Sequence, residues 1–307
     1  MRLSLNGIEL RCDPDRYGEL RDAHHLLDDL HALKARMEED GYLLLRGFLD
    51  RETVLNARKE ILSKYASVGE IDAIHHPLMD AVYSEESSID RIDLAAFAES
   101  IRSGAAYENV VMNPKLVAFF ERWFGRGAVR TFDFKWPRFF RPGEGTGLHC
   151  DSPYVNRGTS NLYSAWIPLG DVDRENGALL VLENSHKSER LKETYCARDS
   201  DRDALDWLDT DPHRLQDELG GRWLTSDFKA GDVFLFSINL VHGGLDNNSP
   251  TKRCRLTSDT RYQPADEPLD DRWNGFRRRA DNAQGARAAD VAAARRELGR
   301  LILRPPK

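Results

Sequence analysis

The second half of the chain is a succession of short β-rich runs, and this succession constrains the fold more than any other feature of the sequence. Each run is rich in apolar, aromatic or β-branched residues and is bounded by Gly, Pro, Asn or Asp. Runs of this length, separated by turn residues, are typical of an antiparallel barrel or sandwich. The runs are Val129 to Phe140, Leu148 to Tyr154, Asn161 to Leu169, Ala178 to Leu182, Asp232 to Ile238 and Arg255 to Tyr262.

Helices are expected ahead of this β-rich part. Apolar residues recur at three- and four-residue steps between Asp22 and about Asp40, which predicts an amphipathic helix. The apolar run from Tyr42 to Phe48 follows and predicts a buried strand. Asp50 is then placed to cap a second helix that reaches about Ala66. Residues 67 to 128 are mixed in character, and we assign no chemistry to them.

Two polar segments interrupt and follow the β-rich part. Residues 184 to 227 form an acidic insertion that is too long for a simple turn, and such segments are usually functional covers or poorly ordered. The tail from 266 to 307 is partly basic and contains strong helix formers between Ala288 and Leu301. With 307 residues and 40% apolar content, the chain is expected to form one large β-rich domain with helical additions.

Charge and cysteine usage limit the partners and the compartment. The formal net charge of −7 provides no basic field for nucleic acid or for an anionic membrane surface. The amino terminus carries charged residues where a signal peptide needs an apolar run, and the sequence has no stretch of 18 uninterrupted apolar residues. The four cysteines lie far apart and form no CxxC pair, unlike a zinc cage or a secreted disulfide framework. We therefore expect a cytoplasmic protein, of undetermined oligomeric state, without nucleic-acid or membrane partners.

The triplet His149-Cys150-Asp151 and the distant His242 form the pattern that points to chemistry. Residues two apart in a strand point to the same side, so His149 and Asp151 can face a barrel interior while the cysteine faces away. His242 follows an apolar strand and precedes a pair of glycines, where the backbone can turn freely. Two imidazoles and one carboxylate suit non-haem Fe(II), because they leave open positions for oxygen chemistry. His186 is the chief competitor as third ligand, but it lies in an apparent exposed turn.

Several stretches, in order along the chain, resemble the phytanoyl-CoA dioxygenase-like branch of the Fe(II)/2-oxoglutarate-dependent oxygenases. The resemblance spans roughly residues 35 to 265, and the ordered combination is specific although no single motif is. Relatives often have glutamine where this chain has Cys150. Related halogenases have a small residue where this chain has Asp151, so the presence of this aspartate favours oxygenation over halogenation. The matching stretches are Asp40 to Phe48, Arg141 to Asp151, Ala165 to Asp171 with Glu175 to Leu179, Asn184 to Lys187, and Lys229 to Asp232 leading to His242-Gly243-Gly244.

The resemblance implies a mainly β fold with packed helices. Its core is a double-stranded β-helix, or jelly roll, over about residues 128–265 of a single domain (1–307), with N-terminal and C-terminal helical additions. The resemblance also implies that His149, Asp151 and His242 bind Fe(II), with 2-oxoglutarate and O2 as co-substrates. Trp166 is expected to line the 2-oxoglutarate pocket, with a plain core role as the alternative.

A downstream arginine is expected to hold the distal carboxylate of 2-oxoglutarate, because the planar guanidinium can bind a carboxylate in bidentate geometry. Arg253 stands 11 residues after His242, the separation common in the family, whereas Arg255 opens a predicted strand. Both have the same strand parity, so alternation cannot separate them. We favour Arg255, because the polar segment before it looks like a loop of variable length. Arg253 is the second candidate, and a solvent-facing edge position is the alternative for both.

The resemblance predicts that 2-oxoglutarate is converted to succinate and CO2 while a C–H bond of a small-molecule substrate is hydroxylated. Lys135, Arg138 and Arg141 precede the iron motif and are candidates for binding an anionic substrate or the co-substrate, although a solvated strand edge explains them equally well. Two other classes stay open. One is a jelly-roll protein that binds a metal or ligand without turnover, and the other is a cupin-type metalloenzyme that does not use 2-oxoglutarate. A carboxylate-binding arginine argues against the first, because a structural site needs no co-substrate anchor.

Overall fold

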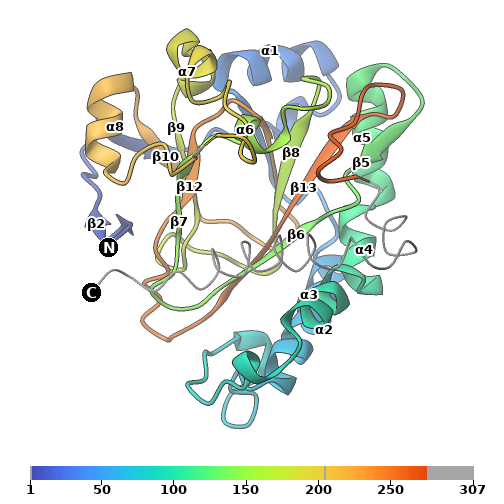
Figure 1. Cartoon of the computed structure of the whole chain (residues 1–307), viewed down its shortest axis with the longest axis vertical. Helices are drawn as coiled ribbons and strands as arrows, with labels where there is room; N and C mark the ends of the chain where they lie inside the picture. The colour runs from blue at the N-terminus through green and yellow to red at the C-terminus, as the bar shows by residue number, and fades with distance from the viewer. Residues whose placement is uncertain (1, 204, 275–307) are drawn as a thin grey trace.

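Two sheets form the centre of the molecule in the computed structural model, which describes residues 2–203 and 205–274 (Figure 1). One sheet has the strand order β3-β10-β9-β12-β7, and the other has the order β4-β11-β8-β13-β5 with β6 paired to β13. All neighbours pair antiparallel except β10 with β3. The strands of the first sheet are β3 (Tyr17–Glu19), β7 (Thr146–His149), β9 (Leu179–Leu182), β10 (Trp223–Thr225) and β12 (His242–Gly244). Those of the second are β4 (Tyr42–Leu45), β5 (Val129–Thr131), β6 (Trp136–Phe140), β8 (Tyr163–Pro168), β11 (Val233–Ser237) and β13 (Arg255–Pro264).

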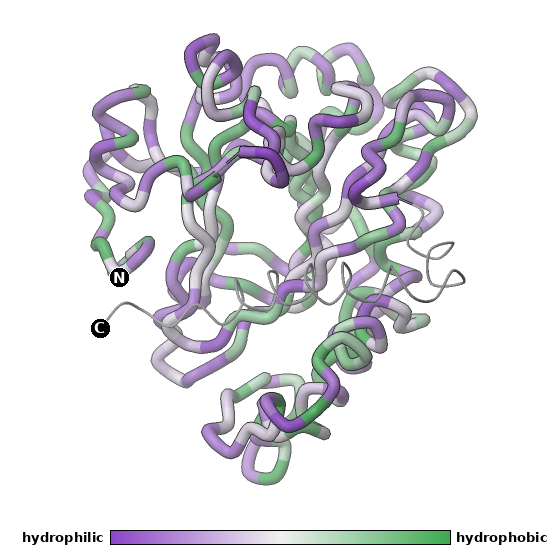
Figure 2. Tube along the Cα trace, in the orientation of Figure 1, coloured by the Kyte–Doolittle hydropathy of each residue, from purple (hydrophilic) through white to green (hydrophobic). Residues whose placement is uncertain are grey.

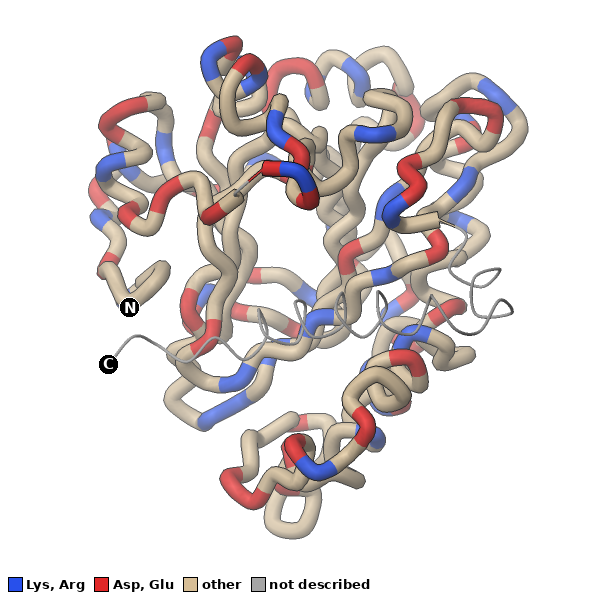
Figure 3. Tube along the Cα trace, viewed as in Figure 1, with Lys and Arg blue, Asp and Glu red and all other residues tan. Residues whose placement is uncertain are grey.

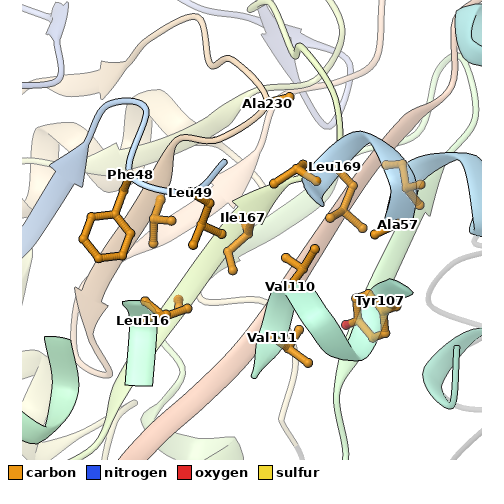
Figure 4. Packing of buried hydrophobic residues seen from close by; sticks show 14 of the residues in the cluster. Phe48, Leu49, Ala57, Tyr107, Val110, Val111, Leu116, Ile167, Leu169 and Ala230 are labelled. Atoms are coloured by element: carbon orange, nitrogen blue, oxygen red, sulfur yellow. The ribbon is translucent and has the colours of Figure 1, made fainter. Parts of the chain in front are cut away.

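Helices from the first part of the chain pack against the six-stranded sheet. They are α1 (Leu30–Asp40), α2 (Arg51–Ser67), α3 (Leu94–Arg102), α4 (Ala105–Val111) and α5 (Pro114–Phe124). Their buried apolar residues join those of the sheet in the largest core cluster. Figure 4 shows part of this cluster, where Val110 and Leu116 from the helices lie near Ile167 of β8. The helical layer therefore covers one face of this sheet and leaves its other face to the site.

The predicted N-terminal elements are confirmed with shifted boundaries. The first helix begins at Leu30 rather than Asp22, because the side chain of Asp29 accepts a hydrogen bond from the backbone N–H of Ala32 and sets the start. It ends at Gly41, whose φ of 78° suits glycine. The predicted strand is β4, and Asp50 caps α2 through the backbone N–H of Thr53, as expected.

Most of the predicted β-rich runs are strands, but two are only partly so. The run from Val129 to Phe140 divides into β5 and β6, because residues 132–135 leave the ladder. The run from Leu148 to Tyr154 is wrong in its second half, since β7 ends at His149 and a short helix, α6 (Ser152–Val155), follows. The segment His242–Gly244 was expected to be a strand-to-loop junction, but it forms strand β12. The hairpin β1 (Ser4–Leu5) and β2 (Ile8–Glu9) was not predicted.

The polar segment between β9 and β10 is folded. It contains α7 (Glu189–Glu193) and α8 (Pro212–Leu219). The predicted insertion of residues 184–227 is too long, because its last part includes β10 (Trp223–Thr225), which pairs with β9 in the five-stranded sheet. Figure 2 shows hydrophilic residues along much of its outer part, and Figure 3 shows acidic and basic residues interspersed along the trace. The predicted C-terminal helical stretch, Ala288 to Leu301, lies outside the described residues. None of the described helices combines the length and apolar content needed to span a bilayer.

Strand β13 links the helical core to the interior between the sheets. All its residues are buried, and they alternate in chemistry. Leu256 and Tyr262 belong to the helix-side core cluster. The residues of the opposite parity are all polar or charged, and they are Arg255, Thr257, Asp259, Arg261 and Gln263. Burial of three charged side chains on one strand face is costly unless ligands or partners compensate them, so this face marks a functional interior.

Candidate active site

His149, Asp151 and His242 come together in the interior, as predicted. Each offers one ligand atom, and these atoms lie within 4.8 Å of one another. His242 opens β12 directly opposite His149 on β7, and the two rings are 4.2 Å apart between centroids. The Oδ1 atom of Asp151 lies 3.9 Å from Nε2 of His149 and 3.8 Å from Nε2 of His242. The described residues thus present two imidazoles and one carboxylate to a single point.

The backbone conformation that places Asp151 beside the two histidines differs from the prediction. It does not continue the strand, because its backbone is helical (φ −73°, ψ −25°) and it forms the N-cap of α6. Pro153 in the first turn favours this helical start. A tight turn after His149, rather than strand alternation, therefore brings the carboxylate beside the imidazole. Cys150 points away, as expected, and its Sγ lies 2.6 Å from Sγ of Cys196 in the insertion.

Both histidines are held with one ring nitrogen turned to the metal position. Nδ1 of His149 lies 2.9 Å from the carbonyl oxygen of Gly147, and Nδ1 of His242 lies 2.9 Å from that of Leu240. A carbonyl can only accept, so each Nδ1 carries the proton and each Nε2 keeps its lone pair. Burial and the neighbouring His242 lower the pKa of His149 to about 3. His149 is therefore neutral near pH 7, the form that binds a metal.

The two oxygen atoms of the Asp151 carboxylate have different partners. Its Oδ2 atom accepts hydrogen bonds from Ser164 Oγ at 2.5 Å and from Arg261 Nη2 at 2.7 Å, while Oδ1 faces the histidines. Burial by itself raises the pKa of Asp151, but Arg261, the two histidines and Ser164 together lower it below its usual range. Asp151 is therefore an anion with one oxygen available to a metal. Sequence reasoning missed Arg261, although its parity with Arg255 on a single strand was a usable signal.

The donor set fits non-haem iron. Two neutral imidazole nitrogens and one carboxylate oxygen on one side of an ion leave positions open for other ligands, the arrangement of Fe(II) oxygen chemistry. A structural zinc site, in contrast, is closed by four protein ligands. No fourth His, Cys, Asp or Glu joins this group among the residues that the structure describes. The competitor His186 lies elsewhere, with Nε2 3.0 Å from the carbonyl oxygen of Glu38 on α1.

Arg255 and Arg253 occupy different environments. Arg255 is fully buried, its Nη1 donates to the carbonyl oxygen of Gly177 at 2.6 Å, and its guanidinium lies 3.7 Å from the ring centroid of Phe140. Its Nε has no hydrogen-bond partner, and it forms no ion pair with the described residues. Burial lowers the pKa of Arg255 to about 9, so it remains a cation near pH 7. A buried cation without an acidic partner fits an anionic ligand such as a dicarboxylate.

Arg253 lies outside β13, at an isolated bridge to Val82. Its side chain is 32% exposed, and its Nη2 donates to the carbonyl oxygen of Asp171. The second sequence candidate therefore points away from the interior.

Two adjoining cavities open from the metal position. The smaller is lined by Arg255, Trp166 and all three candidate ligands. The larger is partly open to solvent and is lined by His149 and Asp151 together with aromatic side chains. Arg138 and Arg261 line both. Trp166 and Arg255 therefore lie on the wall of the same cavity.

The basic residues predicted to bind the substrate lie in different parts of the structure. Arg138 lies on β6 and lines both cavities, and its Nε donates to Asp259 at 2.6 Å. Lys135 does not line either cavity, since it is buried with its Nζ 3.6 Å from Glu108 of α4. Arg141 lines neither cavity, and its Nη2 lies 2.7 Å from Oε1 of Glu70. Of the three basic candidates, the structure thus places only Arg138 beside the metal position.

Comparison with known proteins gives a family match and two similar relatives. A family model described as phytanoyl-CoA dioxygenase (PhyH) matches residues 37–254. A "1-deoxypentalenic acid 11-beta-hydroxylase" from Streptomyces arenae is 29% identical over 261 residues, 82% of this chain and 87% of the relative. A protein of the same description from Streptomyces exfoliatus is 27% identical over 262 residues, with the same coverage of 82% and 87%.

Solved structures share the fold at lower sequence identity. The non-heme alpha ketoglutarate dependent carbocyclase SnoK from nogalamycin biosynthesis has a TM-score of 0.52 and 18% identity, covering 81% of this chain and 89% of that one. EctD from S. alaskensis in its apoform has a TM-score of 0.51 and 17% identity, covering 86% of each chain. At this identity the likeness concerns the fold alone.

Proposed function

We infer the reaction of this chain from two premises: it belongs to the phytanoyl-CoA dioxygenase family of Fe(II)/2-oxoglutarate-dependent oxygenases, and it holds the complete ligand triad. It is an oxygenase of the hydroxylase type that uses iron and 2-oxoglutarate. The overall reaction consumes O2, 2-oxoglutarate and a substrate C–H bond, and it yields succinate, CO2 and an alcohol. One oxygen atom enters succinate and the other enters the product.

We propose that the two sheets form a double-stranded β-helix within a single domain of residues 1–307. The antiparallel strand orders and the likeness to solved oxygenase folds support this proposal.

We further propose a reducing, cytoplasmic location, which the free cysteines support.

The proposed iron ligands are Nε2 of His149, Nε2 of His242 and Oδ1 of Asp151. When bound there, Fe(II) supplies the redox chemistry with O2, and the protein supplies binding, orientation and electrostatics. Gly147 and Leu240 fix the tautomers of the histidines through their carbonyl oxygens. Arg261 and Ser164 hold the other oxygen of Asp151 and so keep one oxygen facing the metal.

Arg255 is the proposed anchor for the distal carboxylate of 2-oxoglutarate. The observation that carries this assignment is a fully buried guanidinium, which forms no ion pair with the described residues, in the smaller cavity beside the triad. Trp166 forms part of the wall of the same cavity. Arg253, which points toward Asp171, is not needed for binding.

The proposed substrate is a small molecule that enters the larger cavity. This cavity is partly open to solvent, and it is lined by His149 and Asp151 together with aromatic side chains. The two relatives are described as hydroxylases of a small organic acid, which supports the same kind of reaction here.

The test is formation of succinate from 2-oxoglutarate by the purified protein with Fe(II) and O2, over a library of small molecules. We expect slow succinate formation alone and stimulation by substrates that fit. A binding protein without turnover, or a cupin-type enzyme that does not use 2-oxoglutarate, would form no succinate under any condition. The variant Asp151→Ala serves as the control for iron that is not bound at the site.

A further inference from the structure

We propose that Cys150 and Cys196 are an oxidisable thiol pair, which hydrogen peroxide converts to a disulfide that ties the insertion between β9 and β10 to the turn carrying the iron ligands. Cys150 stands between His149 and Asp151 in the sequence, but its side chain belongs to an apolar core cluster rather than to the ligand set. The proposed oxygenase reaction does not use either thiol. The pair is therefore a separate modification site next to the iron position.

The two sulfur atoms are in direct contact although the residues are 46 positions apart in the chain. The Sγ atoms lie 2.6 Å from each other, and both thiols are free. The other two cysteines have different surroundings, because Cys12 is exposed and Cys254 belongs to the core cluster on the helix side. Two thiols held side by side react with each other far more readily than with a thiol that must first diffuse to them. The disulfide is therefore expected between Cys150 and Cys196.

The backbone around both cysteines holds the two thiols together. Ser152, at the start of α6, donates a hydrogen bond from Oγ to the carbonyl oxygen of Cys196 at 2.8 Å. The backbone N–H of Cys196 donates to the carbonyl oxygen of Leu191 in α7 at 2.9 Å. The contact between the sulfur atoms is thus set by the packing of α7 against the turn after β7.

Cys196 is the thiol that meets the oxidant first. It is 4% exposed, whereas Cys150 is completely enclosed. The hydrogen bond from Cys150, together with the charge of Lys192, lowers the pKa of Cys196 in spite of its burial, which favours the reactive thiolate. So little exposure admits a molecule of nearly the size of water and excludes bulky thiol reagents. Hydrogen peroxide is an oxidant of that size.

The oxidation consumes one peroxide for each disulfide. The Cys196 thiolate attacks one oxygen of the peroxide, the O–O bond breaks, and a sulfenic acid forms while hydroxide takes up the proton lost by the thiol. Sγ of Cys150 then attacks the oxidised sulfur, so that the S–S bond forms, the S–O bond breaks and a second water leaves with the Cys150 proton. The two thiols together lose two electrons, and the peroxide is reduced to two waters.

The disulfide would add a covalent attachment to a contact that the insertion already makes with β7. The indole ring of Trp207 fills the space that a Cβ atom on residue 147 would occupy, which only glycine leaves free. The backbone N–H of Leu208 donates to the carbonyl oxygen of Leu148 at 2.7 Å. After oxidation the insertion is attached at two places to β7 and the turn that follows. The wall that Trp207 forms beside His149 is then more rigid.

The test uses the full-length chain with Cys12→Ser, so that the exposed thiol cannot link two chains. The protein is freed of metal with a chelator, treated with hydrogen peroxide, blocked with a thiol reagent and digested without reductant for mass spectrometry. We expect a peptide pair joined through Cys150 and Cys196. Free thiols should fall from the three that remain to one, Cys254, and dithiothreitol should restore all three.

Thermal unfolding measures the effect of the link on the fold. Closing a loop of this length should raise the unfolding midpoint of the oxidised protein by roughly 5 °C. Hydrogen exchange of the backbone around Trp207 should also become slower, because the insertion opens less often. In Cys196→Ala neither change should follow peroxide treatment. Cys254→Ala replaces another buried cysteine and is the matched control, in which both changes should persist.

Three results would overturn the proposal. The first is a pair of thiols that stays reduced in peroxide, and the second is their conversion to sulfinic acid without a disulfide. The third is a disulfide that forms but leaves hydrogen exchange around Trp207 unchanged, which would remove the attachment of the insertion. All these measurements are made without iron or 2-oxoglutarate. A failure to form succinate would therefore remove the oxygenase proposal and leave the thiol pair in place.

Discussion

Arg261 donates a hydrogen bond of 2.7 Å to Oδ2 of Asp151, the only carboxylate among the three candidate iron ligands that the described chain brings together. The guanidinium also lies 4.5 Å from the ring centroid of Trp136, which keeps it in place. The pair connects β13, which also carries Arg255, to the turn that follows β7. In the proposed site, one strand therefore carries both the arginine that contacts an iron ligand and the arginine assigned to 2-oxoglutarate.

The first prediction concerns this pair. Replacing the positioning residue in Arg261→Gln removes the charge that orients Asp151, so the affinity for Fe(II) should fall about 10- to 100-fold, as for other groups that orient metal ligands. Anaerobic titration with an Fe(II) chelator as competitor measures this affinity. Arg126→Gln, on the surface, is the matched control. Unchanged iron affinity in Arg261→Gln would show that Asp151 is oriented without it.

The second prediction separates the two arginines near the start of β13. Arg255→Gln should weaken 2-oxoglutarate binding by about 2–5 kcal/mol, the usual cost of removing one partner of a buried charge pair. Arg253→Gln should change it little, because Arg253 is partly exposed and points toward Asp171. Calorimetric titration of 2-oxoglutarate into the anaerobic Fe(II) protein distinguishes them. A larger loss from Arg253→Gln would reverse the assignment.

The third prediction concerns the contact between Gly147 and Trp207. Gly147→Ala places a Cβ where the indole ring lies, so the ring must move and the cavity wall beside His149 should open. We expect succinate to form with less hydroxylated product for each 2-oxoglutarate consumed, since water enters more freely. Trp207→Ala should have a similar effect. The double variant should lose little more than either single variant, because both changes act on one contact. Fully additive losses would count against this view.

The fourth prediction is a pH dependence of stability. Burial raises the pKa of Glu144 to about 7 from an ordinary value of 4.5, so folding favours its protonated form. The stability from this group is present in full below pH 4.5 and is lost as the pH rises through about 7. Relative to the wild type, Glu144→Gln should therefore gain up to about 3 kcal/mol between these limits. Urea unfolding of both proteins at several pH values measures the difference, and a difference independent of pH would refute the prediction.

Sequence reasoning identified the metal ligands because their chemistry is specific, but it described part of their geometry wrongly. His149 and Asp151 were assigned to one strand by alternation, whereas Pro153 favours a helical start that turns the carboxylate toward the imidazole. Strand alternation could not separate Arg253 from Arg255. Which of them faces the interior depends on the residue at which the strand begins to pair with its neighbours. In the structure the strand begins at Arg255, and the preceding arginine contacts a different part of the chain.

The residues around the proposed substrate cavity were much less predictable from the sequence. Trp207 lies in a segment whose composition is typical of a solvated loop, and its place beside His149 depends on contacts across the chain. The even spacing of Arg255 and Arg261 indicates a shared strand face, but only the paired strands show that this face is the interior one. The insertion and the strand registers were therefore beyond what local patterns determine.

The most direct test of the central claim is the visible absorption of the anaerobic protein with one equivalent of Fe(II) as 2-oxoglutarate is added. If His149, Asp151 and His242 hold the iron and leave positions open, the weak charge-transfer band of the Fe(II)–2-oxoglutarate chelate should appear and saturate. His242→Ala should diminish it at the same iron concentration. A wild-type protein that binds Fe(II) but develops no band at saturating 2-oxoglutarate would contradict the account.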